Sequence, residues 1–230
     1  MTIAESLSRV REEIAEACRR AGRDVAGITL VGVTKTFPAS VIREAAQAGL
    51  RDVGENRVQE ILAKRPELLD CPLTWHMIGS LQTNKVKGLL PHLGVLHSLD
   101  RASLVTEFDR APADTPIPAL IQVNTTGETT KSGVRPDEVE PLLVAALASS
   151  RLRVHGFMTI GPWGGTEDDN RRAFSKLREL RERMAARFPE AGLPWLSMGM
   201  SDDFPVAIQE GATHVRIGSR IFGVRPPLRS

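Results

Sequence analysis

The segment LVGVTKTFP, residues 30–38, decides how this sequence folds. Its first four residues are apolar and suit a buried strand. Lys35 follows almost at once, and Pro38 stands where a helix begins. Lys35 is therefore either a solvated charge at the end of the strand or a buried amine at the mouth of a barrel.

On both sides of this segment, strand patterns alternate with helical patterns along the chain. The predicted strands cover residues 28–34, 51–54, 74–79, 94–98, 117–123, 153–158, 195–198 and 213–217. The predicted helices between them cover residues 39–48, 57–64, 82–90, 101–110, 136–149, 167–188 and 203–210. Eight evenly spread strands favour a single closed (β/α)8 TIM barrel, an α/β fold. An open, doubly wound sheet is the alternative, because the second and fourth strands are weak.

An extra helix is expected before the first strand. The apolar residues of this segment recur at spacings of three and four, as on one face of a helix. These residues are Ile3, Leu7, Val10, Ile14 and Cys18. We expect residues 1–22 to pack as a helix on the barrel and residues 1–230 to form one domain, since no linker or repeat divides the chain.

Composition limits the classes of partner. Lys+Arg number 30 and Asp+Glu 28, which leaves a formal net charge of +2 and argues against nucleic acid or a membrane surface as partner. No phosphate-loop, dinucleotide or zinc motif occurs, so we expect a small-molecule partner and no metal. The N-terminal segment lacks the apolar core of a signal peptide or membrane span, which predicts a cytoplasmic protein.

In a parallel barrel, functional groups gather at the C-terminal ends of the strands. Lys35 ends the first strand. Pattern alone favours a solvated lysine there, whereas a desolvated amine would form a Schiff base with an aldehyde or ketone. His76, in the third strand, either lines the site or is a hydrogen-bonded core histidine.

The turn after the seventh strand is a candidate phosphate site. It lies in LSMGMSDDF, residues 196–204, where Ser201 and Asp202 are good N-cap types for the next helix. Unpaired N–H groups at such a turn bind phosphate. The carboxylates of Asp202 and Asp203 would have to point away from it.

The last strand carries Arg216 within an apolar run, in HVRIGSRIFG, residues 214–223. An arginine is costly to bury unpaired, so it faces either solvent or a partner in the barrel mouth. Alternation along the strand leaves both faces open. Gly218 and Ser219 then begin another tight turn.

Six segments, in one order over about residues 31–223, resemble the pyridoxal phosphate homeostasis protein family: VGVTKTFP, DVGENRVQE, WHMIGSLQTNK, GFMTIGP, LSMGMSDDF and VRIGSRIFG. These proteins are relatives of the alanine racemase barrel, in the fold-type III class of pyridoxal 5'-phosphate (PLP) proteins. The resemblance implies that Lys35 holds PLP as a Schiff base and that Arg216 approaches the pyridine nitrogen. It implies phosphate contacts from Met200, Ser201, Gly218 and Ser219. Positions near the cofactor are Asn56, His76 and Ile78.

The resemblance also bears on catalysis. An arginine at the pyridine nitrogen favours the unprotonated ring, which is a weak electron sink. Alanine racemase takes a second acid/base group, a tyrosine, from a C-terminal β-domain. This sequence has no tyrosine, and we expect no such domain.

The resemblance therefore implies a non-catalytic PLP carrier in vitamin B6 homeostasis, acting indirectly on amino-acid and keto-acid balance. The alternatives are a slow PLP-dependent amino-acid racemase and a lysine-dependent aldolase for a sugar phosphate. PLP-dependent apoenzymes are the expected recipients, and a monomer is expected. Lys131, in the polar loop 125–134, either aids cofactor exchange or is simply solvated.

Overall fold

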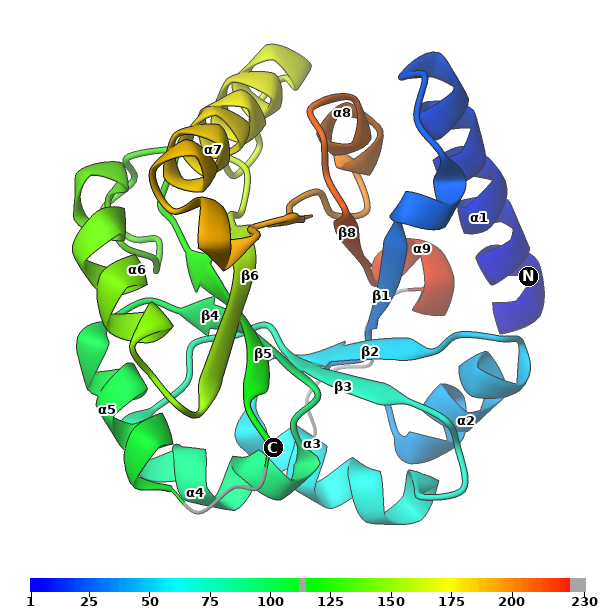
Figure 1. Ribbon diagram of the computed structural model, residues 1–230. Helices are drawn as coiled ribbons and strands as arrows, with labels where there is room; N and C mark the ends of the chain where they lie inside the picture. The colour runs from blue at the N-terminus through cyan, green and yellow to red at the C-terminus, as the bar shows by residue number, and fades with distance from the viewer. Residues whose placement is uncertain (112–114, 224–230) are drawn as a thin grey trace.

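The structure is a computed structural model that describes residues 1–111 and 115–223. Eight parallel strands follow one another around a closed barrel, and the last pairs with the first. Figure 1 shows this closure, with β1 in blue beside β8 in dark orange. The strands are β1 Thr29–Val33, β2 Asp52–Glu55, β3 Thr74–Met77, β4 Val95–Leu99, β5 Ile117–Gln122, β6 Leu152–Met158, β7 Trp195–Ser197 and β8 His214–Ile217. The predicted closed barrel is confirmed, and the open-sheet alternative is wrong.

Helices surround the barrel, as Figure 1 shows. They are α1 Ile3–Arg20, α2 Ala39–Gln47, α3 Val58–Lys64, α4 Val86–Leu89, α5 Ala102–Arg110, α6 Val139–Leu147, α7 Glu167–Arg187, α8 Phe204–Gln209 and α9 Ser219–Phe222. The helix predicted over 82–90 is reduced to α4 between two short 3-10 turns. Gly88 weakens its centre and Pro91 lacks the N–H that would extend it. The sequence patterns did not predict α9.

The strands bury different surfaces on their two faces. Their outer faces join the helices in one large apolar core. Inside the barrel, a small apolar group consists of Val95, Leu120 and Met158, against which Ile160 and Trp195 pack. Polar side chains occupy much of the remaining interior and form part of the candidate site.

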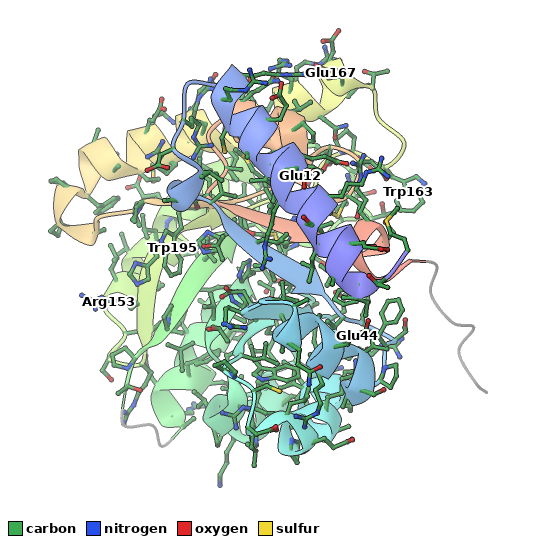
Figure 2. The ribbon with its side chains drawn as sticks, turned by 90° about the vertical axis from the view of Figure 1, so that its right-hand side faces the viewer. Glu12, Glu44, Arg153, Trp163, Glu167 and Trp195 are labelled. Atoms are coloured by element: carbon green, nitrogen blue, oxygen red, sulfur yellow. The ribbon has the colours of Figure 1, made fainter. Side chains whose placement is uncertain are left out.

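The expected helix before the first strand is α1. Thr2 and Glu5 form a capping box at its start, and its apolar stripe is buried. It packs against α2, α8 and α9 on the outside of the barrel. Figure 2 shows it crossing the outer surface, with Glu12 labelled on it.

The single domain over 1–230 stays a prediction, because residues 112–114 and 224–230 lie outside the described part. Within the described part, every helix is either too short or too polar to span a lipid bilayer.

Candidate functional site

Lys35 lies in a turn just after β1 and is half-buried. The next residue, Thr36, has a φ of 71°, the one positive φ outside glycine among the described residues. A β-branched residue adopts this conformation only where its surroundings impose it. Hydrogen bonds do so from both sides of Lys35. The Thr36 N–H donates to Glu60 at 2.7 Å, and the Lys64 ammonium donates to the Thr34 carbonyl at 3.0 Å.

Behind this turn, between the barrel wall and α3, lies a group that we call the acid–lysine cluster: Glu55, Glu60 and Lys64. Lys64 donates to Glu55 at 2.8 Å and to Glu60 at 2.7 Å. The Thr34 hydroxyl donates to Glu55 at 2.7 Å. Burial raises the pKa of Glu55 to about 7, although Lys64 opposes this shift. The cluster therefore places a buried carboxyl group and a lysine directly behind the lysine turn.

Arg216 points into the barrel, which answers the question that strand alternation left open. Only 4% of the residue is exposed. Its guanidinium donates to the Ser197 hydroxyl at 2.6 Å and to the Thr159 carbonyl at 2.8 Å. Burial lowers its pKa to about 10, while the charge of Asp203 opposes this shift. Arg216 is therefore still a cation at neutral pH.

A row of hydrogen bonds continues from Arg216 across the barrel interior. Ser197 is bonded to His97 Nδ1 at 2.9 Å. His97 Nε2 is bonded to His76 Nδ1 at 2.8 Å. His76 Nε2 is bonded to Asp52 at 3.0 Å. We call these five residues the histidine chain. Burial lowers the pKa of His97 well below its usual range, and the nearby His76 adds to the shift, so His97 is neutral.

The turns after β7 and β8 meet at the same end of the barrel. The Gly218 N–H donates to the Ser201 hydroxyl at 3.3 Å. A Cβ at position 218 would lie 3.3 Å from the carbonyl oxygen of Val33, two residues before Lys35. The final turn therefore packs directly on the strand that carries Lys35.

The N-cap prediction for this region is wrong, because α8 begins at Phe204 and Asp203 precedes it. Asp203 is buried and accepts the Met200 N–H at 2.5 Å. Burial raises its pKa, against that hydrogen bond and the charge of Arg216. The Met200 N–H is thus engaged within the protein, while Asp202 is exposed.

A cavity of about 290 Å³ opens at the barrel mouth. Asn56 and Ile78 both line it, as do Gln122 and Lys131. Lys131 is tied down by Glu128 and by the Gly161 carbonyl, each at 2.7 Å, so it is more than a solvated loop lysine. Gln122 Oε1 is buried without a hydrogen-bond partner among the described residues. Such an orphaned acceptor beside a cavity fits a site that binds a polar ligand.

Comparison with known proteins places this arrangement in a family. The profile of the family described as "Alanine racemase, N-terminal domain" matches residues 6–226. The pyridoxal phosphate homeostasis protein of Aquifex aeolicus is 48% identical over 227 residues, which cover 98% of this chain and 99% of the relative. That of Escherichia coli K12 is 40% identical and covers 97% of each chain. This chain belongs to the pyridoxal phosphate homeostasis protein family.

Solved structures agree with membership of this family. PipY of Synechococcus elongatus, with PLP bound, has a TM-score of 0.85 and 35% identity, over 96% of this chain and 100% of that one. Alanine racemase from Corynebacterium glutamicum has a TM-score of 0.70 and 16% identity, over 97% of this chain and 63% of that one. At that identity, the second likeness shows the fold alone.

For this family member, the structure brings the predicted residues together in three groups. Asn56 and Ile78 line the mouth cavity. His76 and Arg216 belong to one hydrogen-bonded row inside the barrel. The third group is at the last two turns, where Ser201 bonds Gly218, Ser219 begins α9, and Met200 is partly exposed.

Sequence reasoning missed residues that lie beside the predicted ones. They are Glu55, Lys64, His97, Gln122 and Ser197. Glu55 and Gln122 end their strands, which was a usable signal in a parallel barrel. Ser197 lies within the quoted segment LSMGMSDDF but was not singled out in it, and His97 belongs to none of the quoted segments.

Proposed function

We propose that this chain binds PLP at the barrel mouth, with a Schiff base on Lys35, and serves in PLP homeostasis rather than in catalysis. The observation that carries the proposal is the packing of the turn at Gly218 on Val33. This turn, our candidate for binding a phosphate, therefore lies beside the end of β1, two residues before Lys35. The family relatives named above and the PLP-bound PipY support the choice of cofactor.

The donor groups present fit such a cofactor. Lys35 supplies an amine that condenses with an aldehyde and releases water. Ser201, Gly218 and Ser219 supply a hydroxyl and backbone groups for a phosphate, and Arg216 supplies a buried cation for the ring nitrogen. The N–H groups of Met200 and Gly218 already donate within the protein, to Asp203 and to the Ser201 hydroxyl, so a phosphate would have to share or displace these hydrogen bonds. When bound, PLP supplies an aldehyde and an electron-accepting ring.

Arg216 also argues for a carrier rather than an enzyme. Its pKa of about 10 keeps the guanidinium charged. A cation that donates hydrogen bonds disfavours a proton on the ring nitrogen, and without that proton the ring withdraws electrons weakly. The 230 residues also hold no tyrosine to act as a phenolic acid or base. These residues support storage or transfer of a reactive aldehyde.

Lys35→Ala tests the proposal, with Lys87→Ala as the control because Lys87 is exposed on α4. Each protein is incubated with PLP, reduced with borohydride, digested and analysed by mass spectrometry. We expect the visible absorption band and the labelled peptide in the control and in the wild type only. A labelled Lys35→Ala protein would mean that another lysine carries the cofactor.

The intact proteins, assayed before reduction, separate the alternative activities. A sugar-phosphate aldolase would show no pyridoxal absorption and would be trapped with a ketose or aldose phosphate instead. A racemase would incorporate solvent deuterium at the α-carbon of alanine, and a rate well above that of free PLP would overturn the carrier proposal.

We extend the proposal to the setting of the protein. We propose PLP-dependent apoenzymes as recipients, a cytoplasmic location, a monomer, and an indirect effect on amino-acid and keto-acid balance. Transfer from the loaded protein to an apoenzyme, followed by the recovery of that enzyme's activity, tests the first of these. Sedimentation measurements test the monomer.

A further inference from the structure

The buried charge of Arg216 has an unusual environment. Among the described residues, its hydrogen-bond acceptors are a hydroxyl and a carbonyl, Ser197 and Thr159, and no carboxylate pairs with it. The charge of Asp203 acts on Arg216, but no hydrogen bond joins the two among the described residues, and a buried cation depends on the groups that it bonds. Through the Ser197 hydroxyl, the histidine chain links Arg216 to the carboxylate of Asp52.

The two ends of this chain have fixed hydrogen-bonding roles. A guanidinium only donates, so Arg216 donates to Ser197. A carboxylate only accepts hydrogen bonds, so His76 Nε2–H must donate to Asp52. Every group between them has to give one hydrogen bond and take one.

With neutral imidazoles, only one arrangement of protons satisfies the chain. Since His76 carries its proton on Nε2, its Nδ1 is an acceptor, and His97 must donate from Nε2. His97 Nδ1 is then an acceptor, so the Ser197 hydroxyl donates to it. Four hydrogen bonds thus point the same way, from Arg216 through Ser197, His97 and His76 to Asp52.

The surroundings hold this chain in place. Ser197 and His97 are fully buried, and His76 is 1% exposed. The ring of His214 packs edge-on against His97, with ring centres 5.9 Å apart. The Asp52 side chain is 25% exposed, and Asp52 and Arg216 both pair in register with Val31 of β1. The chain therefore crosses the barrel interior from β8 to β2.

We propose that Asp52, His76, His97 and Ser197 are positioning residues for Arg216. Their one-directional chain fixes the orientation of the guanidinium and makes it a stronger hydrogen-bond donor, with the Asp52 carboxylate as the acceptor at the other end of the chain. Polarised chains of this kind strengthen each member bond. The inference rests on the proposed function, since PLP is the group that Arg216 would face.

The first test needs no cofactor. Nitrogen-15 correlation spectra of the imidazoles in the PLP-free wild type report which nitrogen is protonated. We expect His76 and His97 both to carry the proton on Nε2. A proton on Nδ1 of either ring would reverse the chain and overturn the proposal, whatever the protein binds.

The second test removes the charge at the far end. Asp52→Asn keeps the shape and an accepting oxygen, whereas Asp70→Asn, which breaks a pair with Arg43 outside the barrel, is the matched control. We expect the absorption maximum of bound PLP to shift in Asp52→Asn and to stay unchanged in Asp70→Asn. Identical spectra in Asp52→Asn and wild type would contradict the role of Asp52.

The third test breaks and restores one link. Ser197→Ala removes one hydrogen bond from Arg216 and one from His97, and we expect PLP to bind roughly ten- to hundredfold more weakly. Ser197→Thr keeps a hydroxyl and should recover most of that affinity. Equal losses in both variants, with both proteins folded by circular dichroism, would reduce Ser197 to a packing role and overturn its part in the proposal.

Failure of the proposed function would look different. If the wild type shows no visible band with PLP, then PLP is not the ligand, and the imidazole spectra still decide whether the hydrogen-bonded chain exists. If the wild type binds PLP and all variants match it, only the positioning role of the chain is wrong.

Discussion

The acid–lysine cluster and the histidine chain lie on opposite sides of the barrel wall and keep polar groups from water in different ways. The cluster, outside the wall, joins Lys64 to the carboxyl groups of Glu55 and Glu60 over distances of 2.7 to 2.8 Å. The chain, inside the wall, joins Arg216 to Asp52 through a hydroxyl and two imidazoles. The cluster holds the backbone of the lysine turn, and the chain holds a side chain of the mouth.

This difference has opposite consequences with pH. Glu55 keeps its proton in the folded state up to a pKa of about 7, so folding is favoured at low pH. His97 resists protonation in the folded state, so folding is favoured at high pH. Glu55 therefore lowers the free energy of unfolding as the pH rises toward 7, and His97 lowers it as the pH falls below about 6.5.

The largest effect is expected from Lys64→Met. It leaves the buried Glu55 and the half-buried Glu60 without the Lys64 cation and frees the Thr34 carbonyl. We expect a loss of about 3 kcal/mol in the free energy of unfolding, measured with urea. Lys87→Met, at an exposed position, is the control and should change little. A loss below about 1 kcal/mol would mean that the cluster is not a true buried pair.

Glu55→Gln should alter how stability depends on pH. Between pH 4.5 and about 7, the unfolded chain releases the Glu55 proton while the folded chain keeps it. The free energy of unfolding of the wild type therefore falls as pH rises through this window, by up to about 3 kcal/mol relative to Glu55→Gln. Parallel stability curves for the two proteins between pH 4.5 and 7.5 would contradict this.

His97→Gln should alter the pH dependence of stability in the opposite direction. The folded-state pKa of His97 is lowered, so below about pH 6.5 the unfolded chain takes up a proton that the folded chain refuses. We expect His97 to lower the free energy of unfolding by about 1.4 kcal/mol for each pH unit below 6.5. The variant should lose that slope, whereas His92→Gln, outside the barrel, should lose less of it.

The smallest effect should come from Glu16→Gln on α1. Glu16 pairs with Arg19 and Arg20 on the exposed face of the helix. Exposed pairs of this kind contribute about 0.5 kcal/mol. Urea unfolding in low and high salt measures it, and a cost comparable to Lys64→Met would show that burial is not what separates the two networks.

The strands, and with them the barrel, were predictable because apolar runs and helix punctuation are local signals. Even β2 and β4, the weak ones, formed where expected. The predicted helix boundaries were wrong where a single residue disfavours the helix that its neighbours favour, as Gly88 does in α4.

The site was harder to predict because its contacts join distant parts of the chain. His97 and Ser197 are 100 positions apart in the sequence, and both stand in short strands whose other residues are mostly apolar. Whether Arg216 faced inward depended on the closure of the barrel, which alternation along one strand does not report. Nothing local marks Thr36 as left-handed, since threonine seldom adopts that conformation.

The placement of α1 has a consequence for how the protein is made. The larger part of its partner surface belongs to α8 and α9, which come from the other end of the barrel sequence. On the ribosome, its buried stripe of Leu7, Val10 and Ile14 emerges long before those helices are translated. The helix that is synthesised before the barrel therefore docks fully only after the last strand has closed the barrel. It then packs against the helices on either side of the junction between β1 and β8.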